Sequence, residues 1–505
     1  MPNLRTNRGT IMVTIWEVLA RAEDGPASQD KDFDLKLFSA RVTELVKDRE
    51  IKCDPECVIP DDNSLADDVF EAGLDLAIDV GLWCRETGRR ITFQEAEVND
   101  ELKHLPAEIV IGIGKDSRVM KHRSVEDNRP PLIQMGPLGQ STSEDMFIPE
   151  NYVFATEPLM DYFNGGSLRN LYGRQIRAGS PSEVEAGKYE VSMVRDALRR
   201  AGRPGTHILG VESSIGDLGQ IAAASTEGGL RTSDGHMVAM AAELKTDYPA
   251  LSKVVHILRY GAFICGLYTV FIGGLAGGAE GAAITRVAGS ILTNAVYKAS
   301  YSITNIRDLM FYQRQMKIPR LKNLLWAGSV SQQAMSRNSN MLIGDSAHGI
   351  GGPCTQMFFY ECAVATIAHV VSGASFVETS FAAENRFPDH PGVLEARFTA
   401  ELAHAIAAAS LKREDANELI RNLITHKLKA FEDKDAPVGG TFKELYDVDT
   451  LTARPEYLNL YGKVKAEMQD TFGIEVNKSS AAGQQISLNP NAEHRISKPS
   501  LGSTK

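Results

Sequence analysis

The chain has 505 residues, with 43% apolar and 24% charged residues and a formal net charge of −11. An acidic chain without a basic face cannot offset phosphate charges, so we expect no nucleic-acid partner. The length allows two or three average domains, or one large α/β barrel with insertions.

Six cysteines are scattered along the chain, and only Cys53 and Cys57 lie close together. No second pair or nearby histidine completes a zinc-ligand set, so we expect no metal site. Sparse cysteine use is typical of a reducing compartment, and residues 1–25 lack the apolar core of a signal peptide. We therefore expect a cytoplasmic protein.

Amphipathic helical patterns fill the first hundred residues. Apolar residues recur at three- and four-residue spacing over 13–47, and a second helix begins at the cap residues Asn63 and Ser64. Residues 95–102 show a third, shorter pattern. We interpret residues 1–105 as a helical extension packed beside the main domain.

From residue 106 onward, strand-like runs alternate with helical patterns at intervals of roughly 30–40 residues, which indicates βαβ units and a parallel sheet. We predict strands in 107–114, 130–139, 206–212, 250–260 and 270–278, a hairpin within 115–124, and short apolar runs at 323–328 and 341–345. We predict helices over 151–171, 180–201, 281–300, 360–372, 392–409, 413–431 and 455–472. Residues 106–476 then form a (β/α)8 TIM barrel with C-terminal helices, and the polar residues 477–505 a disordered tail.

The uncharged run 260–279 is long enough to cross a bilayer. It contains six glycines, however, and no aromatic belt flanks both of its ends. Strands of a parallel sheet, buried on both faces, also read as continuous apolar runs. We interpret this stretch as parts of two buried barrel strands and a glycine-rich rim that leads to Glu280, and we expect no membrane span.

Polar residues just past the carboxyl ends of barrel strands face the active site of such a fold. Carboxylates in an apolar barrel mouth gain proton affinity and can bind a cation or exchange protons, although such residues also cap helices or pair with surface arginines. The sequence contains no GxSxG, P-loop, HExxH or GxGxxG motif that would favour another enzyme class. The predicted strands place the following residues at such ends or near them: Glu212, Glu243, His256 or Tyr260, Glu280, Asp345, His348 and Gln356.

Eight segments, in this order, resemble the monomethylamine:corrinoid methyltransferases. They are GPLGQSTSEDMFIP, SEVEAGK, AGRPG, GVESS, SDGH followed by AELK, VFIGGLAGGAEG, GGPCTQM and GGTFKELYDV. The resemblance implies a (β/α)8 barrel assembled as a homo-oligomer, a hexamer. It also implies transfer of a methyl group from an amine to the cobalamin-type corrinoid of a separate corrinoid protein, with no cofactor bound tightly by this chain.

One departure from that family is visible. Its members carry pyrrolysine at a strand end shortly after a histidine that resembles His256, and the matching position here is Leu258 or Tyr260. The Gln and Tyr that flank pyrrolysine look replaced by Ser346 and His348. The resemblance therefore implies catalytic roles for Glu280, Glu212 and His348, and substrate-binding roles for Leu258, Tyr260, Glu243, Ser346 and Gln356.

Without pyrrolysine, two routes to methyl transfer stay open. The methyl donor can already bear a good leaving group, as in a quaternary ammonium or a sulfonium, held by carboxylates and by aromatic faces such as Tyr260 and Tyr268. Alternatively, Glu280 or His348 can protonate a poorer leaving group. A different hypothesis is that the barrel has lost transfer chemistry and acts as a binding or regulatory partner of a corrinoid protein.

Overall fold

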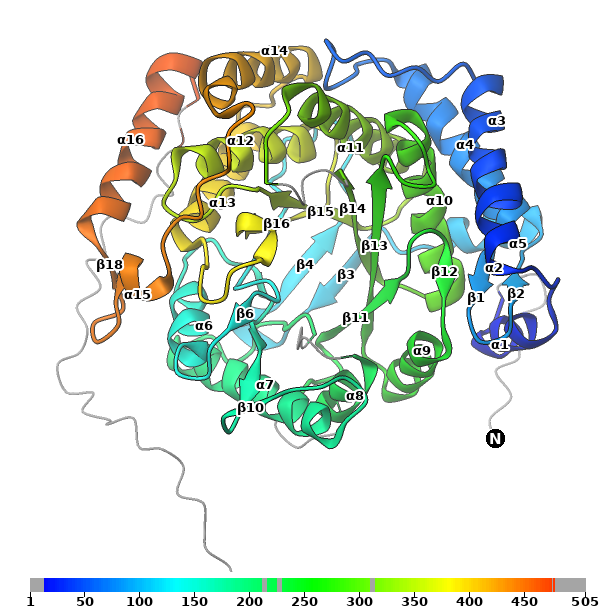
Figure 1. Cartoon of the computed structure of the whole chain (residues 1–505), viewed down its shortest axis with the longest axis horizontal. Coiled ribbons are helices and arrows are strands. Elements are labelled where there is room, and N and C mark those ends of the chain that lie inside the picture. The colour runs from blue at the N-terminus through cyan, green and yellow to red at the C-terminus, as the bar shows by residue number, and fades with distance from the viewer. Residues whose placement is uncertain (1–12, 211–215, 225–228, 309–313, 475, 477–505) are drawn as a thin grey trace, which may run out of the picture.

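A seven-stranded parallel sheet forms the centre of the computed structural model, which describes residues 13–210, 216–224, 229–308, 314–474 and 476 (Figure 1). Its strand order is β11–β13–β14–β15–β16–β5–β7, and each neighbouring pair runs parallel. The strands are β11 (Gly235–Met240), β13 (Phe263–Ile272), β14 (Tyr301–Asp308), β15 (Ile343–His348), β16 (Phe376–Phe381), β5 (Leu132–Met135) and β7 (Tyr162–Phe163). The predicted parallel sheet is thus confirmed.

The sheet curves, so that its first and last strands approach the same short segment. Ile208 forms a parallel bridge to Phe163 on β7, and Leu209 forms one to Gly235 on β11. Only these two residues of the predicted strand 206–212 make bridges, and Glu212 lies outside the described residues. We call the concave side of the sheet its inner face and the helix-covered side its outer face.

Helices cover the outer face: α10 (Ala279–Tyr297), α11 (Ile318–Asn338), α12 (Gln356–Val371) and α13 (Val393–Ala408). The predicted apolar run 323–328 lies inside α11. A second layer lies over α10, because α4 (Asn63–Val80) packs on it at Gly73, where a Cβ would come within 2.5 Å of Val287. This second layer explains why α10 is buried on nearly all sides.

The N-terminal extension consists of α1 (Ile15–Asp24), α2 (Asp30–Asp32), η1 (Phe33–Ser39), α3 (Ala40–Asp48), α4 and α5 (Glu95–Lys103). The cap of α4 is Asp62, whose carboxylate accepts from the backbone N–H groups of Ser64 and Leu65. The extension also adds β1 (Leu82–Cys84) and β2 (Arg89–Ile91), and β1 pairs with β12 (Lys245–Thr246) from the segment after β11. The boundary at residue 105 stays a prediction.

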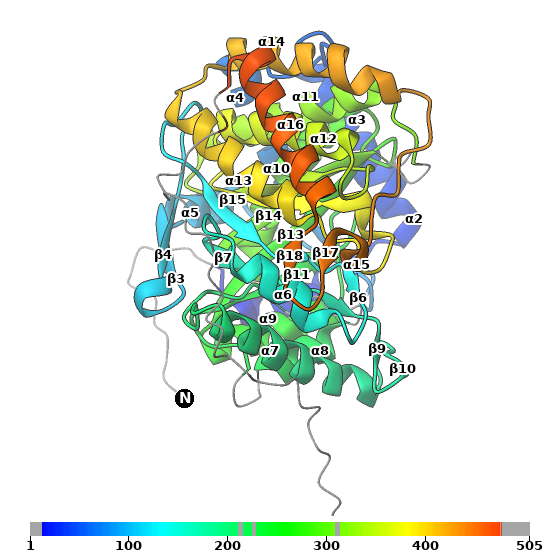
Figure 2. The same cartoon turned by 90° about the vertical axis from the view of Figure 1, so that its left-hand side faces the viewer.

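A hairpin of β3 (Glu108–Ile111) and β4 (Arg118–Lys121) covers the amino end of the sheet. Ile111 and Met120 pack there against inner-face residues such as Tyr301 and Phe376. Seen from the side, this hairpin lies opposite β9 (Asn170–Leu171) and β10 (Arg174–Gln175) (Figure 2). The opposite, carboxyl end of the sheet is therefore the one left for a functional site.

Two predicted elements are wrong, and a third is displaced, because the strand expected over 270–278 is β13, which ends at Ile272. The helix expected over 151–171 is α6 (Phe147–Ala155), which is followed by β7, β8 (Ser167–Leu168) and β9. The strand expected over 250–260 is helix α9 (Tyr248–Tyr260), which Asp247 caps and Gly261 ends at φ 80°. Its buried residues Leu251, Val254 and Ile257 recur every three residues, which is a helical spacing.

The remaining elements follow the chain. The uncharged run is β13 plus a glycine-rich turn, and no described helix is long and apolar enough to cross a membrane. The other helices are α7 (Pro181–Arg200), α8 (Asp217–Ala224), α14 (Arg413–Leu423), α15 (Phe442–Leu445) and α16 (Pro455–Phe472), with η2 (Gly114–Asp116), η4 (Ala382–Asn385), η5 (Ile424–Leu428) and η6 (Lys429–Phe431). The short strands β6 (Ser141–Thr142), β17 (Tyr446–Asp447) and β18 (Thr452–Ala453) complete them. The predicted tail 477–505 lies outside the described residues.

Candidate active site

A row of polar side chains crosses the inner face near the carboxyl end of the sheet. Side chains alternate between the two faces of a strand, and the outward-facing members of these strands pack on helices. The inward-facing ones form what we call the polar row: Thr269, Asn305, Ser346, Glu378 and Gln134, one each from β13, β14, β15, β16 and β5.

The strand register brings the members of the polar row side by side. Thr269 pairs with Asn305, and its hydroxyl donates to Asn305 Oδ1 at 2.7 Å. Ser346 pairs with Glu378, and its hydroxyl donates to the Glu378 carboxylate. Glu378 in turn pairs with Gln134. A single carboxylate therefore stands among neutral hydrogen-bonding groups.

Gln134 has no hydrogen-bond partner at either amide atom, although its side chain is fully buried. Tyr162, its register neighbour on β7, is also fully buried with an unpartnered hydroxyl. Leaving a buried polar group unpaired costs about 1–3 kcal/mol, so such groups are rare unless they serve a ligand. These two side chains mark a place where a polar ligand fits.

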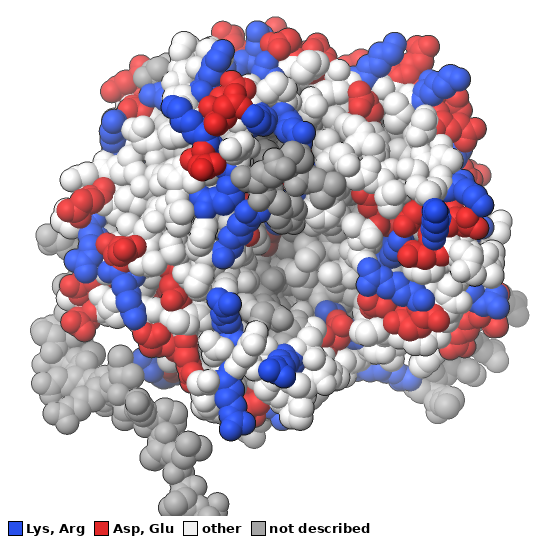
Figure 3. All heavy atoms as spheres, in the orientation of Figure 1, with Lys and Arg blue, Asp and Glu red and all other residues white. Residues whose placement is uncertain are grey.

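The wall facing the polar row borders open space. Ala239 is exposed although it sits on the inner face of β11, the first strand of the sheet, and Leu267 and Phe271 on β13 are partly exposed. The space-filling view shows a hollow at the centre of the molecule (Figure 3). Along β13 the partly exposed side chains of Leu267 and Phe271 therefore lie on either side of Thr269, a member of the polar row.

Arg307 and His348 stand two residues further along β14 and β15, at the rim of the hollow. Arg307 forms an ion pair with Glu384 of η4, and its Nη2 donates to His348 Nε2 at 3.1 Å. Burial and the Arg307 charge lower the pKa of His348 well below its ordinary value. His348 is therefore neutral at pH 7, and its role as a proton donor stays a prediction.

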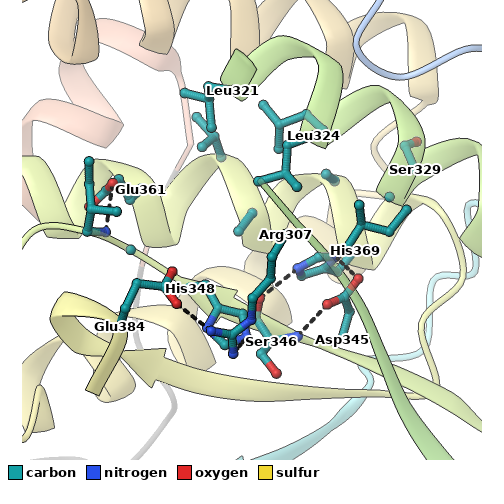
Figure 4. A pocket seen from close by; sticks show the side chains of 18 residues that line it. Arg307, Leu321, Leu324, Ser329, Asp345, Ser346, His348, Glu361, His369 and Glu384 are labelled. Carbon is teal, nitrogen blue, oxygen red and sulfur yellow. Dashed lines mark hydrogen bonds and ion pairs between the residues drawn. The ribbon is translucent and has the colours of Figure 1, made fainter. Parts of the chain in front are cut away.

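A side cavity of about 60 Å³ adjoins this rim, where the carboxyl ends of β14 and β15 meet helices α11 and α12 (Figure 4). Arg307, His348 and Glu384 line one part of it, and Leu321 and Leu324 line another. Asp345, which was expected to face the site, lies on the outer face and pairs with Arg286 at 3.0 Å. Asp345 therefore supports the strand that carries Ser346.

The structure moves the predicted substrate-binding residues Leu258 and Tyr260 away from the hollow. Both lie on α9, outside the sheet, and the Tyr260 hydroxyl donates to the Leu230 carbonyl at 2.7 Å. Tyr268 points outward from β13 and is fully buried in the cluster that joins the sheet to the helices. The two tyrosines thus offer no aromatic face to a ligand in the hollow.

The other predicted site residues are also spread out. Glu280 lies in the first turn of α10 and accepts from the backbone N–H of Cys53 at 3.0 Å, which ties the N-terminal extension to that helix. Glu243 follows β11 and accepts from the backbone N–H groups of Phe271 and Ala276, and burial raises its pKa to about 7. Gln356 is the first residue of α12. Of the predicted site residues that the structure describes, only Ser346 and His348 lie on the inner face.

Sequence reasoning missed Glu378, Gln134 and Arg307. The signal was a polar residue inside each β-rich run, as in FVETSF, PLIQMG and ITNIRD. Among the described residues, no three His, Cys, Asp or Glu side chains gather in a way that could hold a metal ion.

A curved parallel sheet covered by helices, with polar side chains at its carboxyl end, is the arrangement of an α/β enzyme. Comparison with known proteins gives its family. The family model described as "Monomethylamine methyltransferase MtmB" matches residues 13–473. The chain therefore belongs to this family, and it is a methyltransferase.

Individual relatives agree with this assignment. The chain is 30% identical over 453 residues to monomethylamine methyltransferase MtmB1 of Methanosarcina barkeri, covering 89% of this chain and 96% of that protein. It is 30% identical over 450 residues to MtmB of Methanosarcina mazei, with the same shares covered. The crystal structure of the Methanosarcina barkeri enzyme superposes with a TM-score of 0.86 at 28% identity, covering 93% of this chain and all of that one. A structure of a hydroxylamine MtmB complex gives the same values.

Proposed function

We propose that this protein is a pyrrolysine-independent, corrinoid-dependent methyltransferase. It would move a methyl group from a small N-methylated compound, quaternary or protonated, to the Co(I) corrinoid of a separate corrinoid protein. The observation that carries the proposal is the polar row around Glu378, in a chain whose relatives are methylamine methyltransferases. Independence of pyrrolysine is supported by the sequence, which contains only the twenty standard amino acids.

The polar row offers a physical route to orient the donor. Glu378 is the one carboxylate in that row, and a carboxylate attracts a methylated ammonium or sulfonium more strongly than neutral groups do. With the nitrogen held at Glu378 and the unpartnered Gln134, the methyl group can face the open carboxyl end. On transfer the carbon–nitrogen bond breaks, its electron pair stays on nitrogen, and a neutral amine leaves. A cationic donor therefore needs no separate acid.

The corrinoid acts here as the methyl acceptor and stays with its own protein. An acceptor of that size needs an open rim, and the turn after β13 provides one because Gly273 and Gly277 have no neighbour within 4 Å of a Cβ position. We further propose that the sheet together with residues 208–209 is a (β/α)8 barrel, that the protein is cytoplasmic, and that it forms the homo-oligomer expected from the family resemblance.

The test is direct. The enzyme is incubated with candidate methyl donors and a reduced corrinoid protein, and methyl-Co(III) is followed by its absorbance. Formation of methyl-Co(III) with at least one N-methylated donor supports the proposal. Retained binding of the corrinoid protein without transfer from any donor would instead favour the alternative of a binding or regulatory partner.

A further inference from the structure

The β9–β10 hairpin is a rigid, basic projection at the carboxyl end of the sheet. It follows β7 in the chain and lies on the side opposite the β3–β4 hairpin (Figure 2). Its tip residues Tyr172 and Gly173 have φ values of 52° and 71°, as in the tight two-residue turns that suit a hairpin. Tyr172 is 60% exposed.

The base of this hairpin is fixed from two sides. β8 pairs in parallel with β6, and this pairing joins the segment after β7 to the segment after β5. The backbone N–H of Leu168 donates to the buried carboxylate of Glu190 on α7 at 2.7 Å. Tyr172 packs edge-on against Tyr189 of the same helix, with ring centroids 6.1 Å apart. The exposed tip is therefore held in one orientation, which reduces the entropy lost on binding.

Three arginines lie on this hairpin, with Arg174 next to the tip and Arg169 and Arg177 at the base. Arg169, Arg174 and Arg177 are all exposed, and none forms an ion pair with another described residue. Two carboxylates lie nearby, since Glu144 accepts from the Tyr172 backbone N–H and Glu185 is close to the Tyr172 ring. Two further arginines, Arg314 and Arg386, follow β14 and β16 at the same end of the sheet. Figure 3 shows Lys and Arg side chains along the edge of the hollow.

We propose that the β9–β10 hairpin is the docking element for an acidic protein surface, that of the partner carrying the methyl acceptor. The chain as a whole has a net charge of −11, so at long range it repels an acidic partner, and a local basic patch offsets this repulsion. Such a patch steers the partner to the one end where the hollow opens. An exposed tyrosine flanked by arginines is also the composition of a binding hot spot. This inference rests on the proposed function.

The experiment measures association of the full-length protein with its purified, cofactor-loaded corrinoid protein by biolayer interferometry. The variants are Arg174→Glu, and Tyr172→Asn, because Asn tolerates the positive φ of the turn. The control is Lys115→Glu, which makes the same charge change at an exposed, unpaired lysine of η2 at the opposite end. Thermal unfolding midpoints establish that each variant is folded.

We expect both hairpin variants to bind about tenfold more weakly, and the control to stay within about twofold of the parent. Raising the salt from about 50 to about 500 mM should slow association of the parent about tenfold. Equal binding by all four proteins, or association that does not respond to salt, would overturn the proposal.

A second readout separates this inference from the proposed function. Methyl transfer to free reduced cobalamin needs no protein docking, so the hairpin variants should match the parent in that assay. If no donor is demethylated by any protein, the proposed function fails while the binding result still stands. If free cobalamin is methylated normally and the hairpin variants also keep full binding, only the docking inference fails.

Discussion

Replacing Gln134 by leucine should stabilise the protein while impairing methyl transfer. The Gln134 amide is fully buried and both of its polar atoms lack partners, so the folded state carries an unpaired-group cost of about 1–3 kcal/mol. Leucine has nearly the same volume and no polar atoms. We therefore expect the free energy of unfolding to rise by about 1–2 kcal/mol, because natural sites kept for function are rarely optimal for stability.

Gln333 provides the matched control, because it is equally buried but fully bonded. Its Nε2 donates to the Pro60 carbonyl at 2.9 Å and to Ser329 Oγ at 3.0 Å, and its Oε1 accepts from Arg413 at 2.7 Å. The same change to leucine leaves the Arg413 donor and the Pro60 carbonyl without their hydrogen-bond partner. It should therefore cost about 2–5 kcal/mol.

Urea denaturation of the two variants and the parent gives both free energies, and methyl-Co(III) formation gives the activities. A Gln134→Leu protein that is less stable than its parent by more than about 1 kcal/mol would refute the reasoning, because it would show that the amide is well bonded in the folded state. Unchanged donor affinity in that variant would remove Gln134 from the binding site.

Three further predictions concern the framework around the site. Arg286→Met should cost about 3–5 kcal/mol, because the buried Asp345 carboxylate loses its arginine partner and keeps the Ser346 backbone N–H and the neighbouring His369. Adding Asp345→Leu should recover much of that loss, and a double variant no more stable than the single one contradicts this. Gly344→Ala should cost about 1–3 kcal/mol, since the new Cβ would lie 2.1 Å from the Phe376 ring, and calorimetry showing an unchanged melting temperature would count against it. Burial raises the pKa of Glu361 to about 8 from 4.5, so the folded state binds a proton that the unfolded state has lost between these values. The stability of the parent should therefore fall as the pH rises from about 5 to about 8, and the fall should be shallower in Glu361→Gln, as pH-dependent urea titrations can establish.

The parallel sheet was predictable because each βα unit has a recognisable pattern of apolar and small residues within a short stretch of sequence. The apolar residues within 270–278 and the small-residue helix after them indicate a buried strand and its crossover from composition alone, although the strand itself covers Phe263–Ile272. The segment 250–260 was predicted wrongly because, over so short a length, its apolar residues are compatible with both the helical period of 3.6 residues and the strand period of two. The Asp247 cap and the Gly261 stop are the signals that favour a helix there.

The site was harder to predict than the sheet, because the face of the sheet on which a side chain lies depends on the strand register. Glu280 and Glu378 look alike in the sequence, since each is a single carboxylate beside an apolar run. The structure separates them: Glu280 begins a helix and holds the Cys53 backbone, whereas Glu378 points into the hollow beside Ser346. Only the pairing of β16 with β15 and β5 reveals which carboxylate belongs to the polar row.

The most direct test compares Glu378→Gln with Glu280→Gln in a single-turnover assay of methyl-Co(III) formation. If the polar row orients the donor, Glu378→Gln should slow transfer about a hundredfold at saturating donor while its unfolding midpoint stays near that of the parent. Glu280→Gln should stay within about tenfold of the parent rate, because its role is to anchor the N-terminal extension. A fully active Glu378→Gln protein beside an inactive but folded Glu280→Gln protein would contradict the account.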